Sequence, residues 1–278
     1  MVSGLVTLLI ASVAASFVAR AAEPACSIGL KDAAVANAKT VNSMPITPFR
    51  RPETGWAIYE PLIANEIGTT CPAASPEFAA PLAHWQTAQH LPSTGAMDEA
   101  TFNALKRAWD RRRPWVWASR HACPEAANEQ SLARAALSES YDGKTILLEP
   151  EALAAYRRMA EAARKGGLIP AKSGLFAIFS GYRNPDADTA RCAKQNHCQS
   201  GARATCSAHR TGLALDINLG AAPGSRLDSS DDANRLYLSR TKLYRWMVKN
   251  APHFGFVNYA FEPWHWEFVP SSAHQGKH

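Results

Sequence analysis

Two short stretches of alternating apolar residues constrain the fold of this chain more than any other feature. In the stretch 212–219, every second residue is a large aliphatic one, and the residues between them include Asp216. In the stretch 264–268, aromatic residues alternate with His265 and Glu267. Because successive side chains of a strand point to opposite faces, each stretch predicts a strand with one face packed on a core. The other face of this predicted sheet carries the polar residues.

Four residues near these strands form a pattern with a chemical meaning. His209 precedes the first strand, and a turn at 210–211 would bring it to the same side as Asp216. Glu262 stands before Pro263, which favours extended backbone and would hold the carboxylate over a metal without binding it. Two imidazoles, one carboxylate and an unligated glutamate are the ingredients of a catalytic zinc site with an open fourth position. Each residue alone has an ordinary structural explanation, but the four together predict Zn²⁺ at His209, Asp216 and His265.

The N-terminus predicts export from the cytoplasm. Residues 1–22 contain a nearly uncharged apolar run followed by the alanine-rich stretch Ala-Arg-Ala-Ala over 19–22, which is typical of a cleaved secretory signal. The run is shorter than the roughly 20 residues that a membrane-spanning helix needs. We therefore expect a periplasmic or cell-wall-associated protein with no membrane span after signal cleavage.

The chain contains six cysteines, which in an exported protein favour disulfides. We expect Cys26 to pair with Cys71 and the other four to pair among themselves. A thiolate metal site is the alternative, formed by Cys192, Cys198 and Cys206, but their spacing matches no tight zinc knuckle.

The formal net charge of +6 is modest and scattered, apart from the run Arg111–Arg113. A nucleic-acid-binding protein usually concentrates its basic residues in a stripe with aromatic stacking positions, so we predict no nucleic-acid partner. We interpret the run as a solvated helix end that marks a domain boundary. The remaining excess predicts weak attraction to an anionic envelope polymer.

The distribution of apolar residues divides the chain further. Residues 23–75 lack strong periodicity and predict an irregular, disulfide-tied lead-in, whereas 76–115 predicts a helical segment in which Asp98 caps a helix. Residues 116–270 form the main domain, with helices expected from Pro150 to Gly166, over 186–193 and around 243–250. The polar tail 271–278 is expected to be disordered.

The segment 76–115 has its own resemblance. It resembles the small helical peptidoglycan-binding repeat in the order of its motifs. These are Trp85-Gln86, then Leu-Pro-x-Thr-Gly-x-Met-Asp-x-x-Thr over 91–101, then an apolar helix. A plain helical hairpin that packs on the main domain explains the same pattern equally well.

A second resemblance covers roughly residues 145–270. Three motifs carry it: Ser-x-His-x-x-Gly-x-Ala-x-Asp over 207–216, Glu-Pro-Trp-His-Trp over 262–266 and Ser-Gly-Tyr-Arg over 180–183. Together they resemble the motifs of the D-alanyl-D-alanine carboxypeptidases of the VanY type. These zinc peptidases share a fold with the metal-binding domain of hedgehog proteins. The resemblance implies an α+β domain in which a small, mostly antiparallel sheet carries the zinc site, preceded here by the helical segment.

The same resemblance implies roles for the individual residues. His209, Asp216 and His265 would bind Zn²⁺, and Glu262 would act as the general base and then protonate the leaving amine. Arg183 would stabilise the oxyanion or anchor the substrate carboxylate, as a guanidinium fork can. Ser207 would line the site and hydrogen-bond the substrate.

The expected activity is removal of the terminal D-alanine from peptidoglycan stem peptides by a monomeric enzyme. Two alternatives use the same chemistry, an L,D-carboxypeptidase and a peptidoglycan endopeptidase. A third is a zinc-containing wall-binding module without turnover, which would not need Glu262 beside the metal. Two departures from the family pattern bear on specificity, namely the Cys-rich insert 192–206 and Glu267, which stands where basic or neutral residues are common.

Overall fold

The computed structural model describes residues 30–193 and 206–271 of the 278-residue chain. The predicted signal peptide, Cys26, the insert positions 194–205 and the tail from 272 lie outside the described residues. Within the described ranges, no helix is both long enough and apolar enough to cross a membrane.

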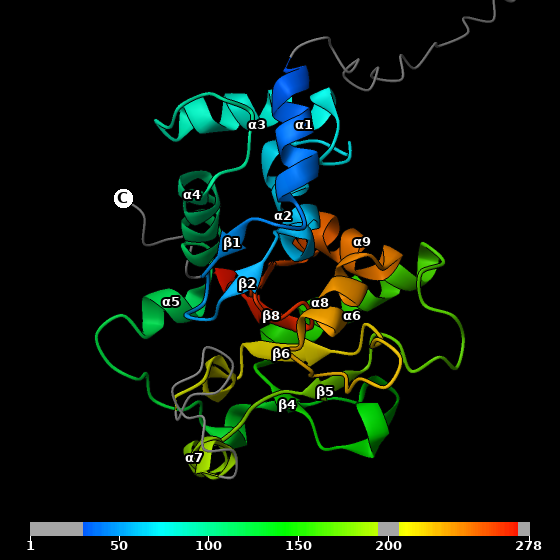
Figure 1. The fold of residues 1–278 in the computed structure, drawn as a ribbon. Helices are drawn as coiled ribbons and strands as arrows, with labels where there is room; N and C mark the ends of the chain where they lie inside the picture. The colour runs from blue at the N-terminus through cyan, green and yellow to red at the C-terminus, as the bar shows by residue number, and fades with distance from the viewer. Residues whose placement is uncertain (1–29, 194–205, 272–278) are drawn as a thin grey trace, which may run out of the picture.

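The described chain consists of helices and short strands (Figure 1). The helices are α1 (Lys31–Thr40), α2 (Glu60–Ile67), α3 (Pro76–Ala88), α4 (Glu99–Asp110), α5 (Pro114–Ala118), α6 (Pro150–Lys165), α7 (Pro185–Ala193), α8 (Asp232–Ser239) and α9 (Lys242–Asn250). The strands are β1 (Pro45–Ile46), β2 (Glu53–Thr54), β3 (Ala133–Arg134), β4 (Leu147–Leu148), β5 (Ile178–Ser180), β6 (Ala214–Ile217), β7 (Phe256–Asn258) and β8 (His265–Phe268).

The largest sheet in the described ranges has the strand order β5-β6-β8-β7, and every neighbouring pair is antiparallel. In the central pair, Asp216 lies directly opposite His265. Leu215, Ile217 and Trp266 point into the hydrophobic core on the other face. The alternation predicted from the sequence is therefore confirmed, although the regular strand is shorter than the predicted stretch 212–219.

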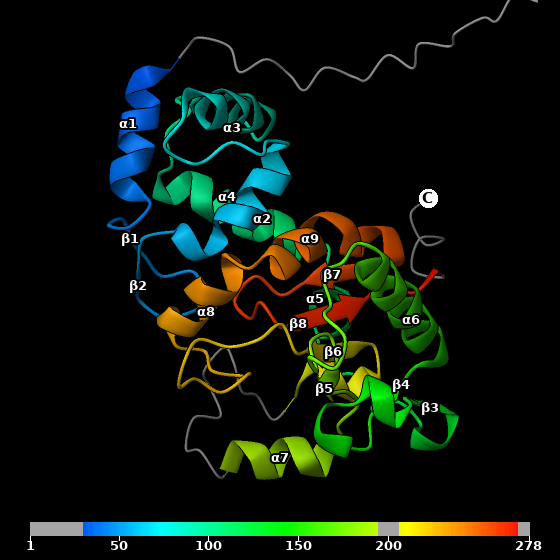
Figure 2. The same ribbon diagram turned by 90° about the vertical axis from the view of Figure 1, so that its right-hand side faces the viewer.

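Helices α6 and α9 cover the apolar face of this sheet (Figure 2). Helix α6 starts at Pro150 and ends before Gly166, as predicted, because proline suits the first helical turn and glycine suits the end. Leu153 and Tyr156 of α6 and Met247 of α9 are fully or almost fully buried in the same core as the sheet. The arrangement confirms the predicted α+β class with a small antiparallel sheet. Helix α8 was not predicted.

The N-terminal region, residues 31–118, buries a second core that is rich in aromatic side chains. Figure 1 shows α1 to α4 gathered at one end of the molecule, and α7 lies at the opposite end in both views. Helix α4 begins as predicted, since the Asp98 side chain accepts a hydrogen bond of 2.7 Å from the Thr101 backbone N–H.

The predicted irregular lead-in over 23–75 is wrong for its described part, which holds α1, the β1–β2 hairpin and α2. Trp56, Tyr59 and Ile63 are fully buried and supply the apolar surface for this fold. Helix α1 docks through a polar contact, because Asn37 bonds to Gly95 O at 2.9 Å and accepts from Met97 N at 2.7 Å. A contact of this kind leaves no apolar periodicity in the sequence.

The two regions share buried residues. Tyr259, Ala260 and Phe261, which follow β7, pack into the N-terminal core. Arg235 of α8 is fully buried and donates to Glu53 Oε1 at 2.9 Å and to the Tyr59 hydroxyl at 2.6 Å. The loop 259–261 and helix α8, which belong to the C-terminal region (residues 133–271), therefore complete the core of the N-terminal region.

Candidate metal centre

Three predicted ligands converge on the polar face of the sheet. Asp216 and His265 come from the paired strands β6 and β8. His209 comes from a 3₁₀ turn over Ala208–Thr211 that leads into β6. Gly212 ends this turn at φ 69°, and a Cβ there would lie 2.9 Å from the Leu132 side chain, so the position favours glycine. The turn predicted at 210–211 thus brings His209 to the side of Asp216.

The donor atoms of these residues lie close together. Asp216 Oδ2 is 3.3 Å from His209 Nε2, and Asp216 Oδ1 is 2.9 Å from His265 Nδ1. One ligand atom from each residue lies within 4.8 Å of the others, and all three residues are buried. This is a group that could hold a metal ion.

The second nitrogen of His209 indicates which atom is available to a metal. Nδ1 lies 2.8 Å from the backbone oxygen of Gly181, just beyond β5. A carbonyl oxygen can only accept, so Nδ1 carries the proton and the lone pair of Nε2 is available to a cation bound beside Asp216. Metal-binding histidines are usually oriented in this way.

The electrostatics of the cluster leave His209 neutral and Asp216 ionised. Burial together with the positive charge of Arg183 lowers the pKa of His209 to about 4, which leaves its imidazole neutral. Burial alone would raise the pKa of Asp216, but its contacts with His209 and His265 lower it below the usual range. Asp216 is therefore a carboxylate between two imidazoles.

His265 faces carboxylates on both sides. Burial would lower its pKa, but the hydrogen bond to Asp216 and the nearby charge of Glu267 outweigh this and raise the pKa to about 9. His265 thus carries a proton on each ring nitrogen, and a metal ion at Nδ1 would replace the proton that faces Asp216.

Glu262 lies on the wall of the same cleft and is half-buried. Burial raises its pKa to about 7, against the opposing effect of His265. The ligand group found among the described residues consists of His209, Asp216 and His265, without Glu262. A carboxyl group with a pKa near neutrality beside a metal site is suited to take up and return a proton.

Arg183 and Ser207 line the cleft as well, and one buried residue holds both. Asp188 of α7 lies 3.1 Å from Arg183 Nε through Oδ1, and its Oδ2 accepts from the Ser207 hydroxyl at 2.7 Å. The short helix was predicted from the sequence, but Asp188 was not among the predicted site residues. Its only signal was a carboxylate placed five residues after Arg183.

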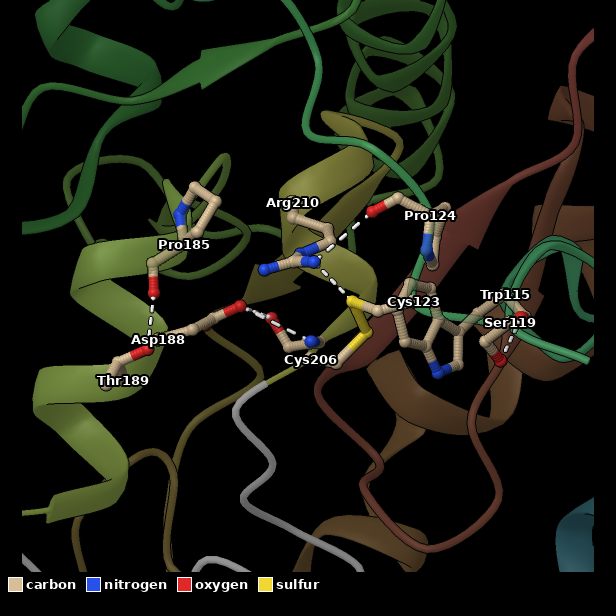
Figure 3. Close-up of a disulfide and its surroundings, with 10 residues drawn as sticks. Trp115, Ser119, Cys123, Pro124, Pro185, Asp188, Thr189, Cys206 and Arg210 are labelled. Atoms are coloured by element: carbon tan, nitrogen blue, oxygen red, sulfur yellow. Dashed lines mark hydrogen bonds between the residues drawn. A yellow bond between two sulfur atoms is a disulfide. The ribbon is translucent and has the colours of Figure 1, made fainter. Parts of the chain in front are cut away.

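The segment that follows α5 is tied to a residue of the cleft wall, Cys206. Cys123 forms a disulfide with Cys206, which directly precedes Ser207, and Arg210 donates to Pro124 O at 3.2 Å (Figure 3). This pair agrees with the expectation that the last four cysteines pair among themselves. The pairing of Cys26 with Cys71 stays a prediction, since Cys26 lies outside the described residues.

The interpretation of Arg111–Arg113 as a solvated helix end is wrong for Arg113, which is 7% exposed. Its guanidinium donates to Glu267 Oε1 through Nε at 2.9 Å, and it stacks 3.9 Å from the centre of the Tyr259 ring. Burial would raise the pKa of Glu267, but Arg113 and His265 lower it to about 2. Glu267, which departs from the family pattern, thus forms an ion pair with Arg113 that was not predicted from the sequence.

All six predicted site residues, Arg183, Ser207, His209, Asp216, Glu262 and His265, line one cleft. A buried His/Asp/His cluster with a glutamate beside it is the kind of arrangement that metal-dependent hydrolases use.

Residues 145–271 match the family VanY, described as D-alanyl-D-alanine carboxypeptidase. This match confirms the resemblance predicted from the sequence motifs and supports a carboxypeptidase activity.

Solved structures of carboxypeptidases resemble part of the chain. The LdcB LD-carboxypeptidase is 23% identical, covering 55% of this chain and 77% of its own, with a TM-score of 0.39. VanYB in complex with D-alanine-D-alanine is 21% identical, covering 58% and 93%, with a TM-score of 0.35. DacB from Streptococcus pneumoniae D39 is 19% identical, covering 54% and 88%, with a TM-score of 0.30. None of the curated protein sequences matches the chain.

Proposed function

We propose that this protein is a zinc-dependent carboxypeptidase that removes the terminal D-alanine from peptidoglycan stem peptides. The observation that carries the proposal is the convergence of His209, Asp216 and His265 in the cleft that Glu262 and Arg183 also line. The match of residues 145–271 to a family of D-alanyl-D-alanine carboxypeptidases supports the substrate class.

The donor set fits zinc. Two imidazole nitrogens and one carboxylate are the usual protein ligands of catalytic zinc, and the Gly181 carbonyl already fixes the tautomer of His209. When bound, zinc supplies Lewis acidity that polarises the scissile carbonyl and makes water a nucleophile at neutral pH.

The residues of the chain perform the proton transfers and the binding. Glu262 takes a proton from the attacking water, whose oxygen forms the new bond to the carbonyl carbon. The peptide C–N bond then breaks, and Glu262 returns the proton to the departing amine. Arg183 offers its guanidinium to the substrate carboxylate or to the developing oxyanion, while Ser207 hydrogen-bonds the substrate.

A protein with this function acts outside the cytoplasmic membrane. The disulfide between Cys123 and Cys206 is compatible with an oxidising compartment. The predicted signal peptide agrees with this location. Wall binding by the segment 76–115 and a monomeric state stay predictions.

A panel of purified muropeptides tests the proposal. The zinc-loaded protein should release D-alanine from a pentapeptide that ends in D-alanyl-D-alanine, and a chelator should abolish the release. Glu262→Gln should keep the metal and the melting temperature but lose about 10²- to 10⁴-fold in rate, the usual contribution of a general acid–base.

Each other outcome excludes part of the proposal. Cleavage of tetrapeptides alone would make the protein an L,D-carboxypeptidase, and cleavage of cross-linked dimers would make it an endopeptidase. Binding without turnover of any muropeptide would make it a wall-binding module. Full activity of Glu262→Gln would remove the assigned base.

A further inference from the structure

A buried arginine reaches the candidate metal centre from outside the segment that matches the peptidase family. Arg113 precedes α5, whereas the family match begins at residue 145. Its Nε and Nη2 both donate to Glu267 Oε1, at 2.9 and 2.5 Å. The backbone N–H of Trp115 donates to Oε2 at 3.1 Å. The carboxylate of Glu267 is therefore held by three donors from two residues of the N-terminal region.

Glu267 in turn lies behind a predicted metal ligand. His265 Nε2 makes no hydrogen bond within the described residues, and the charged group that faces it is Glu267, whose Oε1 lies 3.4 Å away. The other ring nitrogen, Nδ1, faces Asp216 at 2.9 Å. An acceptor behind Nε2 keeps a proton on that nitrogen and leaves Nδ1 as the atom that a metal can bind.

The two candidate histidines are thus oriented by different means. His209 has the backbone oxygen of Gly181 behind it, whereas His265 has the carboxylate of Glu267. A carboxylate that is only 1% exposed is costly to bury without a counter-charge, and Arg113 supplies one through two hydrogen bonds. Arg113 therefore holds the carboxylate that faces His265 Nε2.

We propose that Arg113 is a positioning residue for the metal centre, which holds Glu267 behind His265 so that Nδ1 faces the cation. This inference rests on the proposed function, because the cation is the zinc ion proposed there. The Tyr259 ring stabilises the arrangement, since it stacks against the Arg113 guanidinium and lies edge-on to His265 with ring centres 6.0 Å apart.

A purely structural role would have a different signature. Arg235 and Glu53 also form a buried ion pair between the two regions, but the Arg235 pair does not line the cleft. If Arg113 and Glu267 only tied the regions together, their removal would change the stability and leave the metal site as it is. Metal binding therefore separates the two roles without any measurement of activity.

The test measures zinc affinity by competition with a chelator, and the visible absorption spectrum of the cobalt-loaded protein. The main variant is the double substitution Arg113→Met with Glu267→Met, because removing both charges leaves no buried charge unpaired. Arg113→Lys keeps the charge but loses the planar fork. Arg112→Gln is the matched control, since this neighbour forms an exposed two-bond pair with Glu66 at 2.6 and 2.7 Å.

We expect the double variant to bind zinc about 10- to 100-fold more weakly than the wild type, as loss of such outer contacts usually causes. Its cobalt spectrum should shift as well. Arg113→Lys should show a smaller loss in the same direction, and Arg112→Gln should match the wild type.

A folded double variant with wild-type zinc affinity and cobalt spectrum would overturn the inference alone. If the double variant does not fold, Arg113→Lys decides, and wild-type affinity and spectrum there would equally overturn it. A wild-type protein that binds neither zinc nor cobalt would remove the proposed function, and the inference with it.

Discussion

The N-terminal and C-terminal regions of this protein bury separate hydrophobic cores, but they contribute unequally to the cleft. The C-terminal core lies between the sheet and helices α6 and α9, and its region supplies all six predicted site residues. The N-terminal core is built from helices with large aromatic side chains, and its region supplies Arg113 and Trp115 to the cleft wall. The limits of the family match are therefore not the limits of the site.

The two candidate histidine ligands are oriented by groups of different origin. The group behind His209 is a backbone oxygen beside β5, which the sheet itself holds in place. The group behind His265 is a side chain, whose position depends on a residue 154 positions earlier in the sequence. We expect the N-terminal region to influence one half of the metal centre and leave the other half unchanged.

The largest expected effect on the association of the two regions comes from Arg235→Met. This change leaves Glu53 buried without its counter-charge and should lower the free energy of unfolding by about 3–5 kcal/mol. Urea denaturation followed by tryptophan fluorescence measures it. Arg51→Met is the control, because Arg51 pairs with Asp232 across the same boundary but is 37% exposed, and its loss should cost no more than about 1 kcal/mol.

Equal effects of the two substitutions would contradict the view that a buried charge network joins the regions. Two separate unfolding transitions in the wild type would contradict it more strongly, because the cores would then unfold independently.

A smaller loss is expected from the paired substitution Cys123→Ser and Cys206→Ser. The disulfide spans 83 residues, and its removal should cost about 2–4 kcal/mol, since it restricts the unfolded chain. A shift of the urea midpoint with an unchanged slope would show this. If the serine variant were as stable as the oxidised wild type, the disulfide would contribute nothing to fastening the connecting segment beside Ser207.

Local patterns predicted the centre of the site well. Asp216 and His265 could be placed because strand alternation separates them from the apolar residues around them, and the Asp98 cap could be placed because capping is a local interaction. His209 could be added because a short turn separates it from the strand.

Long-range polar contacts were out of reach. Arg111, Arg112 and Arg113 are identical residues in one run, and only the fold buries the third of them against Glu267. Arg235 and Glu53 are 182 positions apart, and nothing near either residue indicates the other. Asp188 was missed for a related reason, since its role depends on how α7 faces Ser207.

The most direct test of the central claim is a zinc titration of metal-free protein, with D-alanine release from a stem pentapeptide as the readout. We expect the rate to rise to a plateau at one zinc per chain. His209→Ala should stay at the baseline, and Glu262→Gln should bind one zinc while releasing almost no D-alanine. Release that does not depend on zinc, or that survives the loss of His209, would contradict the account.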